Sequence, residues 1–251
     1  MMETDGTGGI LWPVVSQRAF VTGSTRGIGR AIARAILMSN GRVTVTGRDR
    51  AGVDAAVEAL QVESAGAGRV VGQVLDVRDP VSVERAVSAA AAAFGGLDVV
   101  VNNAGVGIYG GLETVSDADW RMVMDTNVAG PFHVMRASIP RLREAGGGWI
   151  INIASLAGVS PFAGGGVYCA SKAALLALSE SAMQELRGDN IRVSVVLPGS
   201  TATEFSGRSG GDESWRLLPD DVAEVVVDLL RHPARSLPSR VEIRPSRPKK
   251  G

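Results

Sequence analysis

The chain has 251 residues, of which 45% are hydrophobic and 21% charged, and its 26 basic and 26 acidic side chains balance to a formal net charge of zero. This balance argues against nucleic acid or another polyanion as a partner. The single cysteine excludes an internal disulfide framework, and no apolar run approaches the roughly 20 residues that cross a bilayer. Because the N-terminus also lacks a secretory pattern, we expect a cytoplasmic protein with no membrane partner.

The chain opens with a lead-in over residues 1–17, which we expect to be flexible, followed by a single domain over residues 18–243. A strand at 19–22 runs into a glycine-rich turn and then a helix to about residue 38. Glycines spaced Gly-x-x-x-Gly-x-Gly let a backbone approach a pyrophosphate closely, and the helix N-terminus attracts its charge. The alternative is a tight turn that binds nothing. The expected nucleotide contacts here are Gly23, Thr25, Arg26, Gly27, Ile28 and Gly29.

The end of the second strand, at 42–46, bears on which nicotinamide cofactor is used. An acidic residue there would bind the ribose 2′-hydroxyl of NAD, whereas arginine accommodates the 2′-phosphate of NADP. Gly47 occupies the position of the acid and Arg48 follows it, with Arg26 as a second candidate cation. Asp49 competes with this interpretation, but it has the position of an N-cap for the next helix. The pattern therefore favours NADP(H).

The next segments alternate helix and strand: a helix at 51–63, a strand at 69–75, a helix at 81–94 and a strand at 98–101. Asp76, just after the third strand, would meet an adenine amino group or simply cap its loop. Small and amide side chains after the fourth strand leave room for a ligand. A long helix is expected over 116–145, capped by Ser116, with Pro131 inside it. A kink at this proline would expose a carbonyl near Asn127 that binds water.

The stretch 150–178 contains the residues with the clearest chemistry. A buried strand at 150–153 is followed by Ser155, a loop with three glycines, and a helix from Tyr168 to about residue 187. Tyr168 and Lys172 are four residues apart and share a helix face. An ammonium roughly 4 Å from the phenol, at an effective dielectric near 20, favours the phenolate by about 4 kcal/mol. This predicts a tyrosine pKa about three units below its usual value of about 10. Ser155 would hold a substrate oxygen beside it.

The remainder continues the alternation, with a strand at 191–197, a mobile lid at 204–218, a helix at 219–231 and a strand at 240–243. We expect the tail at 244–251 to be an exposed arm or an interface arm. Strands that alternate with helices predict a doubly wound α/β domain of Rossmann type. It would contain about seven parallel strands with helices on both faces. Ligands of such sheets bind beyond the carboxyl ends of the strands, where the polar residues singled out here are expected.

Taken together, these motifs resemble the short-chain dehydrogenase/reductase family over about residues 18–243. Thr22 to Gly29 is similar to its TGxxxGxG turn, Asn102 to Gly105 to its NNAG motif, and Pro198-Gly199 with Thr203 to its PGxxxT segment. The order and spacing of four further residues resemble its catalytic tetrad. These four are Asn127, Ser155, Tyr168 and Lys172.

The resemblance implies that a ketone and a secondary alcohol are interconverted by direct hydride transfer, without a metal. Tyr168 would be the general acid or base, and Lys172 would lower its pKa and bind the nicotinamide ribose. Ser155 would orient the carbonyl, and Asn127 would hold a water. Further cofactor contacts implied by the resemblance are Asp76, Val77, Asn103, Ala104, Gly105, Pro198, Gly199, Thr201 and Thr203. Family members commonly form homotetramers or homodimers through the helices around 116–145 and 167–187.

The substrate is expected to be an uncharged, partly apolar ketone or secondary alcohol, because the residues that we place around it are mostly apolar. These are Ile108, Tyr109, Leu156, Phe162, Phe205 and Trp215. A 3-oxoacyl thioester is another candidate substrate. A non-catalytic NADP(H)-binding sensor or scaffold is the alternative from another functional class. The intact Asn-Ser-Tyr-Lys set argues against it, because a binding protein needs neither the serine nor the tyrosine.

Overall fold

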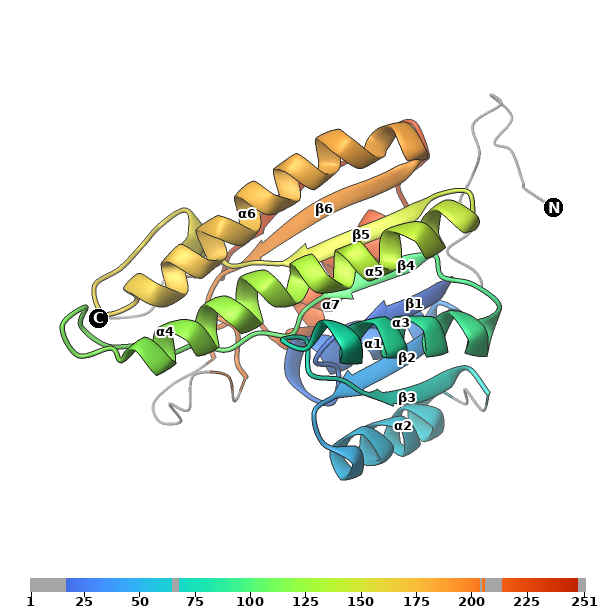
Figure 1. Cartoon of the computed structure of the whole chain (residues 1–251), viewed down its shortest axis with the longest axis horizontal. Coiled ribbons are helices and arrows are strands. Elements are labelled where there is room, and N and C mark those ends of the chain that lie inside the picture. The colour runs from blue at the N-terminus through green and yellow to red at the C-terminus, as the bar shows by residue number, and fades with distance from the viewer. Residues whose placement is uncertain (1–16, 65–67, 204, 206–213, 248–251) are drawn as a thin grey trace.

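A computed structural model describes residues 17–64, 68–203, 205 and 214–247 (Figure 1). The expectations for residues 1–16, for residues 204 and 206–213 of the lid, and for the tail beyond 247 lie outside these residues. The described chain contains a seven-stranded sheet in the order β3-β2-β1-β4-β5-β6-β7. Every pairing is parallel. The doubly wound α/β fold expected from the sequence is therefore confirmed.

The strands are short apolar runs of the kind that fill the centre of a parallel sheet. They are β1 (Arg18–Val21), β2 (Arg42–Gly47), β3 (Val70–Val74), β4 (Val99–Asn102), β5 (Gly148–Ile153), β6 (Ile191–Pro198) and β7 (Arg240–Ile243). From β1 the chain builds the sheet outward in one direction to β3, and from β4 it builds in the other direction to β7. The order thus reverses between β1 and β4, which is where such sheets bind their ligands.

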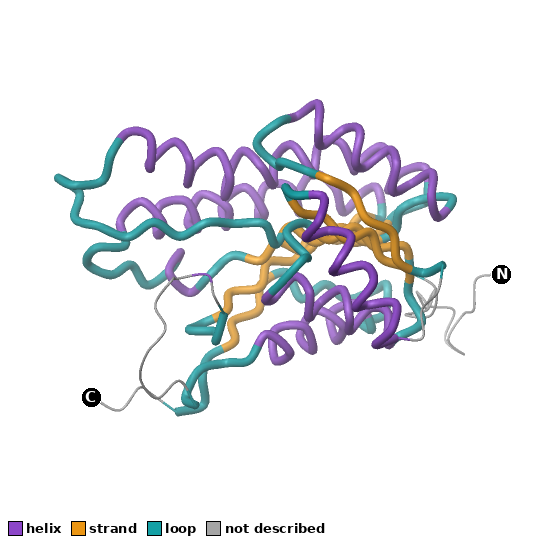
Figure 2. Tube along the Cα trace, turned by 90° about the horizontal axis from the view of Figure 1, so that it is seen from below, coloured by secondary structure: helices purple, strands orange, loops and turns teal. Residues whose placement is uncertain are grey.

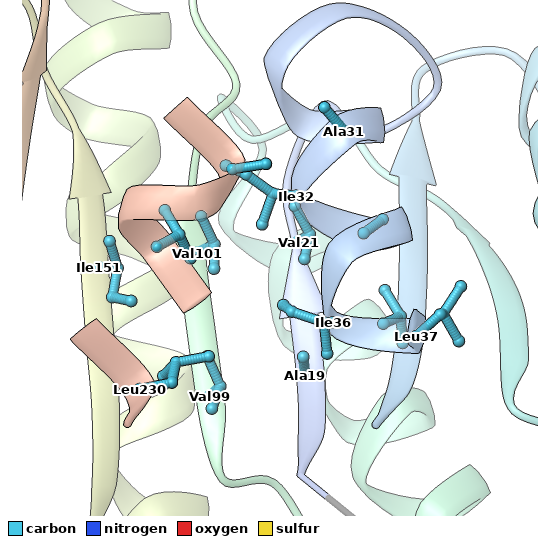
Figure 3. Close-up of a cluster of buried hydrophobic side chains, with 14 of the residues drawn as sticks. Ala19, Val21, Ala31, Ile32, Ile36, Leu37, Val99, Val101, Ile151 and Leu230 are labelled. Carbon is cyan, nitrogen blue, oxygen red and sulfur yellow. The ribbon is translucent and has the colours of Figure 1, made fainter. Parts of the chain in front are cut away.

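Helices cover both faces of the sheet, as Figures 1 and 2 show. One face is covered by α1 (Gly27–Met38), α2 (Arg50–Ser64) and α7 (Pro219–Leu230). The other is covered by α3 (Pro80–Phe94), α5 (Gly130–Glu144) and α6 (Gly166–Leu186), with α4 (Asp117–Met124) preceding α5. Figure 3 shows the core of the first face, where Ile32 and Ile36 of α1 meet Val21, Val99 and Leu230. All five are at most 3% exposed.

The segment expected to be one helix over 116–145 is divided. Helix α4 ends at Met124, a π-helical turn covers Asp125–Ala129, and α5 begins at Gly130. Ser116 caps the start as expected, since its hydroxyl accepts a hydrogen bond from the Asp119 amide. Pro131 lies inside a continuous helical segment, since the π-helical turn runs directly into α5 and the Gly130 amide donates to the carbonyl of Asp125. Its missing N–H therefore removes one helical hydrogen bond, and the free carbonyl expected near Asn127 stays a prediction.

Two segment ends are more ordered than the sequence suggested. Gln17, placed in the flexible lead-in, is buried, and its carbonyl accepts a hydrogen bond from the Arg42 amide at 2.8 Å. Leu217, placed in the mobile lid, is also buried and pairs with the turn after β6. Its amide donates to the carbonyl of Ser200 at 3.0 Å, and its carbonyl accepts from the Ala202 amide at 2.8 Å. The carboxyl end of the lid segment is therefore tied to the sheet.

Two buried asparagines lie opposite each other at the ends of β4 and β5. Asn102 is in register with Asn152, and its side-chain amide donates to the side-chain oxygen of Asn152 at 2.8 Å. The amide of Asn152 donates in turn to Ser179 of α6, also at 2.8 Å. These bonds join two strands and one helix through polar groups in an otherwise apolar interior. None of the helices among the described residues is long and apolar enough to cross a bilayer.

Candidate active site

A cavity of about 1100 Å³ lies at the carboxyl ends of the strands and gathers most of the residues singled out from the sequence. Its wall includes Gly23, Thr25, Arg26, Gly27, Ile28, Arg48, Asp76, Val77, Asn103, Ala104, Gly105, Tyr109, Ser155, Leu156, Phe162, Tyr168, Lys172, Pro198, Gly199, Thr201, Thr203 and Phe205. Four other candidates are not on this wall: Gly29, Asn127, Ile108 and Trp215. The first two lie directly behind it, as described below.

The glycine-rich turn after β1 is shaped by close backbone contacts. Gly23 has a φ of +61°, and a Cβ added there would lie 2.9 Å from the Cα of Ala104. A Cβ on Gly29 would lie 2.4 Å from the carbonyl oxygen of Gly23. The side-chain amide of Asn103 holds the turn in place by donating to the carbonyls of Thr22 and Gly23, each at 3.0 Å. Side chains larger than hydrogen at these two glycines would therefore fill the turn.

Helix α1 begins directly after this turn without a side-chain cap, since Arg26 occupies the cap position and provides none. The first amide groups of a helix need acceptors and carry a partial positive charge. The turn and the helix start together leave a backbone surface suited to a phosphate. The residues present thus fit the pyrophosphate of a dinucleotide.

At the end of β2 the structure places Arg48 and Arg26 on the cavity wall and Gly47 beside them. Asp49 caps α2 as expected, because its carboxylate accepts hydrogen bonds from the amides of Ala51 and Gly52 at 3.2 and 2.7 Å. The Asp49 carboxylate is therefore engaged in capping the N-terminus of α2. No acidic side chain takes the position where NAD-specific proteins of this fold bind the ribose.

Sequence reasoning missed Arg78, which also lines the cavity. Its guanidinium pairs with Asp76 through two bonds, Nη2 to Oδ2 at 2.6 Å and Nε to Oδ1 at 3.0 Å. This hydrogen-bonded partner holds the pKa of Asp76 below its usual range. The backbone amide of Arg78 also donates to Asp76, so this aspartate does cap its loop, while its contact with an adenine amino group stays a prediction. In the sequence, only the two-residue spacing between Asp76 and Arg78 indicates that these side chains could pair.

Tyr168 and Lys172 are both almost fully buried, with 8% and 4% of their surfaces exposed. The Lys172 ammonium lies 5.8 Å from the centre of the Tyr168 ring and donates a hydrogen bond to the carbonyl of Ile153 at 3.0 Å. Burial lowers the pKa of Lys172 from 10.5 to about 8. The pair is therefore brought together on one helix face, as the spacing predicted.

The expected fall in the pKa of Tyr168 is wrong. Loss of water around the phenol raises its pKa above the usual value of 10, and a hydrogen bond with Ser155 opposes this only in part. Burial penalises the phenolate, and the sequence argument did not include this penalty. Tyr168 therefore carries its proton at neutral pH, as a proton donor must.

Asn127 lies behind the cavity, 1% exposed, in the π-helical turn. Its side-chain oxygen accepts a hydrogen bond from the Val106 amide at 2.8 Å. Its amide donates to the Val106 carbonyl at 2.9 Å and to the Ser171 hydroxyl at 3.0 Å. Both N–H groups thus have protein acceptors, and the side chain joins the loop after β4 to helix α6. The water expected at Asn127 stays a prediction, since the sequence argument assigned it to a backbone carbonyl and not to these N–H groups.

Aromatic rings surround Tyr168 on the cavity side. Its ring centre lies 5.6 Å from that of Tyr109 and 5.9 Å from that of Phe205, and Tyr109 is 6.1 Å from Phe162. These separations are typical of favourable ring contacts. Four of the six residues expected around the substrate thus lie on the cavity wall: Tyr109, Leu156, Phe162 and Phe205.

The other two pocket candidates do not form its wall. Ile108 is adjacent to Tyr109, but neighbouring residues of a non-helical segment point in different directions, and only Tyr109 faces the cavity. Trp215 is also not on the wall, and its neighbour Arg216 lies there instead. The guanidinium carbon of Arg216 lies 5.8 Å from the Trp215 ring centre. The sequence analysis did not identify Arg216. Within the described ranges, no three His, Cys, Asp or Glu side chains come together as metal ligands.

The family model for short chain dehydrogenases matches residues 17–214. The chain belongs to the short-chain dehydrogenase/reductase family. It is 38% identical over 195 residues to dehydrogenase/reductase SDR family member 4 of Oryctolagus cuniculus, a match that covers 77% of this chain and 74% of the relative. It is 35% identical to sulfoacetaldehyde reductase 2 of Chromohalobacter salexigens, over 93% of this chain and 96% of the relative.

Two similar solved structures have the same fold. An alcohol dehydrogenase from Thermococcus sibiricus, complexed with 5-hydroxy-NADP, matches with a TM-score of 0.86 and 29% identity, over 94% of this chain and 100% of the other. A metagenomic short-chain oxidoreductase in complex with NADP matches with a TM-score of 0.81 and 36% identity over the same shares. Membership of this family, together with the glycine-rich turn and the start of α1 described above, makes the protein an NAD(P)-dependent oxidoreductase.

Proposed function

We propose that the protein reduces a ketone to a secondary alcohol with NADPH, and catalyses the reverse reaction with NADP⁺, using Tyr168 as general acid and base. The observation that carries this proposal is the position of Tyr168 in the cavity wall, where it is 8% exposed and lies next to Ser155 and Lys172. Burial raises the pKa of the phenol, which keeps on it the proton that a carbonyl oxygen would accept.

The bound nicotinamide supplies or accepts the hydride. The residues of the chain position the substrate and manage the proton. Ser155 orients the substrate oxygen toward the phenol, and Tyr168 donates its proton to that oxygen as negative charge develops there. Lys172 lies close enough to stabilise the phenolate left behind, since its ammonium is 5.8 Å from the ring centre. The burial of Tyr168 and Lys172 themselves, at 8% and 4% exposed, strengthens the electrostatic interaction between them.

The proposed preference for NADPH over NADH rests on charge at the end of β2. Arg26 and Arg48 lie on the cavity wall, Gly47 takes the place of an acid, and Asp49 serves as the cap of α2. Two guanidinium groups match the charge and geometry of a phosphate. Two of the similar solved structures hold NADP or a derivative of it, which agrees with this proposal.

The proposed substrate is an uncharged, partly apolar ketone, because the cavity around Tyr168 is built from Tyr109, Phe162, Phe205 and Leu156. A second candidate is a small carbonyl compound with an acidic group. Arg216 on the wall favours it. The names of two relatives agree with it: the sulfoacetaldehyde reductase described above, and the NADP-dependent 3-hydroxy acid dehydrogenase YdfG of Salmonella typhi, which is 35% identical.

We further propose a cytoplasmic homodimer or homotetramer, assembled through the helices around 116–145 and 167–187. Two large apolar side chains on this part of the surface support that assembly. Trp120 of α4 is 46% exposed and Phe132 of α5 is 44% exposed. The proposed compartment rests on the single cysteine, which lies buried as a free thiol. Family membership gives no support to the alternative of a non-catalytic sensor.

The test is to measure NADPH and NADH binding to the purified protein and then NADPH oxidation with a panel of carbonyl compounds. The panel pairs an apolar ketone with an oxo acid of similar size and includes a 3-oxoacyl thioester. We expect tight NADPH binding and turnover of the apolar ketone, and Tyr168→Phe should lose turnover while keeping NADPH affinity. Faster turnover of the oxo acid would favour the second candidate. Failure to bind either nucleotide would overturn the proposal.

A further inference from the structure

Helix α6 carries a third polar side chain, Ser171, between Tyr168 and Lys172. It is completely buried and does not line the cavity. Its hydroxyl donates a hydrogen bond to the backbone carbonyl of Tyr168 at 2.7 Å and accepts one from the Asn127 amide at 3.0 Å. One hydroxyl therefore connects the backbone of the proposed proton donor to a neighbouring structural element.

Through Asn127 this connection reaches the opposite side of the cavity. The Asn127 side chain exchanges two hydrogen bonds with the backbone of Val106, which lines the cavity. A Cβ on Gly105 would lie 3.2 Å from the Asn127 oxygen and 3.7 Å from the Lys172 nitrogen. Ser171 and Asn127 thus join three parts of the site: the loop after β4, the π-helical turn and the first turns of α6.

The first turn of α6 is held by packing, since Val167, Tyr168 and Cys169 are at most 8% exposed, but no side chain caps it. Tyr168 is the third residue of the helix, and Gly165 at the cap position provides no side-chain hydrogen bond. The preceding loop contains Gly164 with a φ of +75°. The Ser171 hydroxyl does not cap the free amide groups of this turn, but it binds the Tyr168 carbonyl and links it to Asn127. The hydroxyl of Ser171 is a side-chain anchor for the turn that carries Tyr168.

We propose that Ser171 is a positioning residue that fixes Tyr168 relative to Ser155 and to the part of the cavity proposed to bind the cofactor. This proposal rests on the proposed role of Tyr168 as proton donor. Reacting groups must be held closely, and a displacement of about 1 Å can reduce turnover on the order of a hundredfold. Ser171 itself touches neither substrate nor cofactor, so its effect should appear in the catalytic step rather than in binding.

The same helix provides a matched control. Ser179 lies two turns further along α6, is 3% exposed and also joins an asparagine to the helix backbone. Its hydroxyl accepts from the amide of Asn152 at 2.8 Å and donates to the carbonyl of Leu175 at 2.6 Å. Its chemistry and burial match those of Ser171, but it does not line the cavity or bond to the Tyr168 turn. Loss of either hydroxyl should therefore affect folding to a similar extent.

The test compares Ser171→Ala with Ser179→Ala in the full chain, by urea unfolding, NADPH affinity and steady-state kinetics on the best carbonyl substrate. We expect similar losses of stability. In Ser171→Ala, kcat should fall roughly 10- to 100-fold while NADPH affinity and KM change less than about threefold. In Ser179→Ala, kcat should stay within about twofold of the wild-type value. An unchanged kcat in Ser171→Ala, or an equal loss in Ser179→Ala, would overturn the proposal.

A second pair of variants keeps the proposal testable if Ser171→Ala does not fold. Ser171→Thr and Ser171→Val have nearly the same shape and differ in the hydroxyl, so any cost of the added methyl group is shared. We expect kcat to be at least about tenfold higher for the threonine variant, and equal values would contradict the proposal. If the wild-type protein turns over no substrate, the proposed function fails separately. Hydrogen exchange over residues 166–172 then decides the positioning role, since exchange that is no faster in Ser171→Val than in Ser171→Thr overturns it.

Discussion

The burial of Lys172 predicts that an active-site substitution will make the protein more stable. The side chain is 4% exposed, and burial lowers its pKa from 10.5 to about 8. The ammonium therefore destabilises the folded state while it is charged. In Lys172→Met an unbranched apolar chain of similar length replaces it. We expect this variant to unfold at higher denaturant concentration than the wild-type protein at pH 7, although it should lose turnover.

The magnitude follows from linkage between protonation and folding. A fall in pKa from 10.5 to about 8, at about 1.4 kcal/mol for each pH unit, costs the fold about 3 kcal/mol at pH 7. Methionine gives up the hydrogen bond from the lysine to the Ile153 carbonyl, which contributes about 1 kcal/mol. The net gain is about 2 kcal/mol, or a rise of roughly 4–8 °C in Tm for a protein of this size.

The pH dependence separates this explanation from a simple packing effect. Below pH 8 the lysine is protonated in both the folded and the unfolded state, so the full cost is present. Between pH 8 and 10.5 only the unfolded chain keeps the proton, so wild-type stability rises with pH. By pH 9.5 the advantage of Lys172→Met should shrink by about 2 kcal/mol, to near zero. The exposed cation Arg50 provides the control, since Arg50→Met should show no such change.

The assay is urea unfolding of wild-type protein and both variants at pH 7 and pH 9.5. A Lys172→Met variant that is less stable at pH 7, with a difference that does not change with pH, would refute the reasoning about burial.

Three further predictions concern the cofactor and substrate. In titration calorimetry, Arg48→Ala should weaken NADPH binding about tenfold or more and leave NADH binding unchanged. Arg50 is exposed, pairs with Asp54 and does not line the cavity, so Arg50→Ala should change neither affinity. Equal losses for both nucleotides would remove the assignment of the 2′-phosphate. Gly29→Ala should abolish nucleotide binding and destabilise the fold by about 1–3 kcal/mol, because its Cβ would lie 2.4 Å from a backbone oxygen. Gly188→Ala, with nothing within 4 Å of its Cβ, should change neither measurement. Phe162→Leu should lower kcat/KM for an aryl ketone roughly two- to tenfold relative to acetone, and an equal effect on both ketones would argue against ring contact with the substrate.

Much of the fold could be predicted because local patterns and the global arrangement agree. Val99, Val100 and Val101 form a run too short for a helix and too apolar for a surface strand, and they lie in the centre of the sheet. The glycines after β1 indicate a turn whose geometry permits nothing larger. Tyr168 and Lys172 could be paired because helical spacing alone puts them on one face. These features depend on residues close together in sequence.

The features that the sequence did not reveal depend on distant partners. The π-helical turn contains Asn127, whose bonds reach Val106, 21 residues earlier, and Ser171, 44 residues later. No periodicity records such contacts. The direction of the pKa change at Tyr168 depends on how much water the folded protein excludes. Arg216 lies on a segment without regular structure, where spacing does not indicate which side chain faces the cavity.

The pair formed by Asn102 and Asn152 affects how the sheet assembles. The neighbouring strands are so uniformly apolar that sliding β4 by one residue along β5 would cost little in hydrophobic contact. Such a slip would separate two amides that are 3% and 0% exposed and leave them facing aliphatic side chains. Unpaired buried amides cost about 1–3 kcal/mol each. The asparagines thus select one alignment among several that valine and isoleucine would accept, and misaligned folding intermediates should be short-lived as a result.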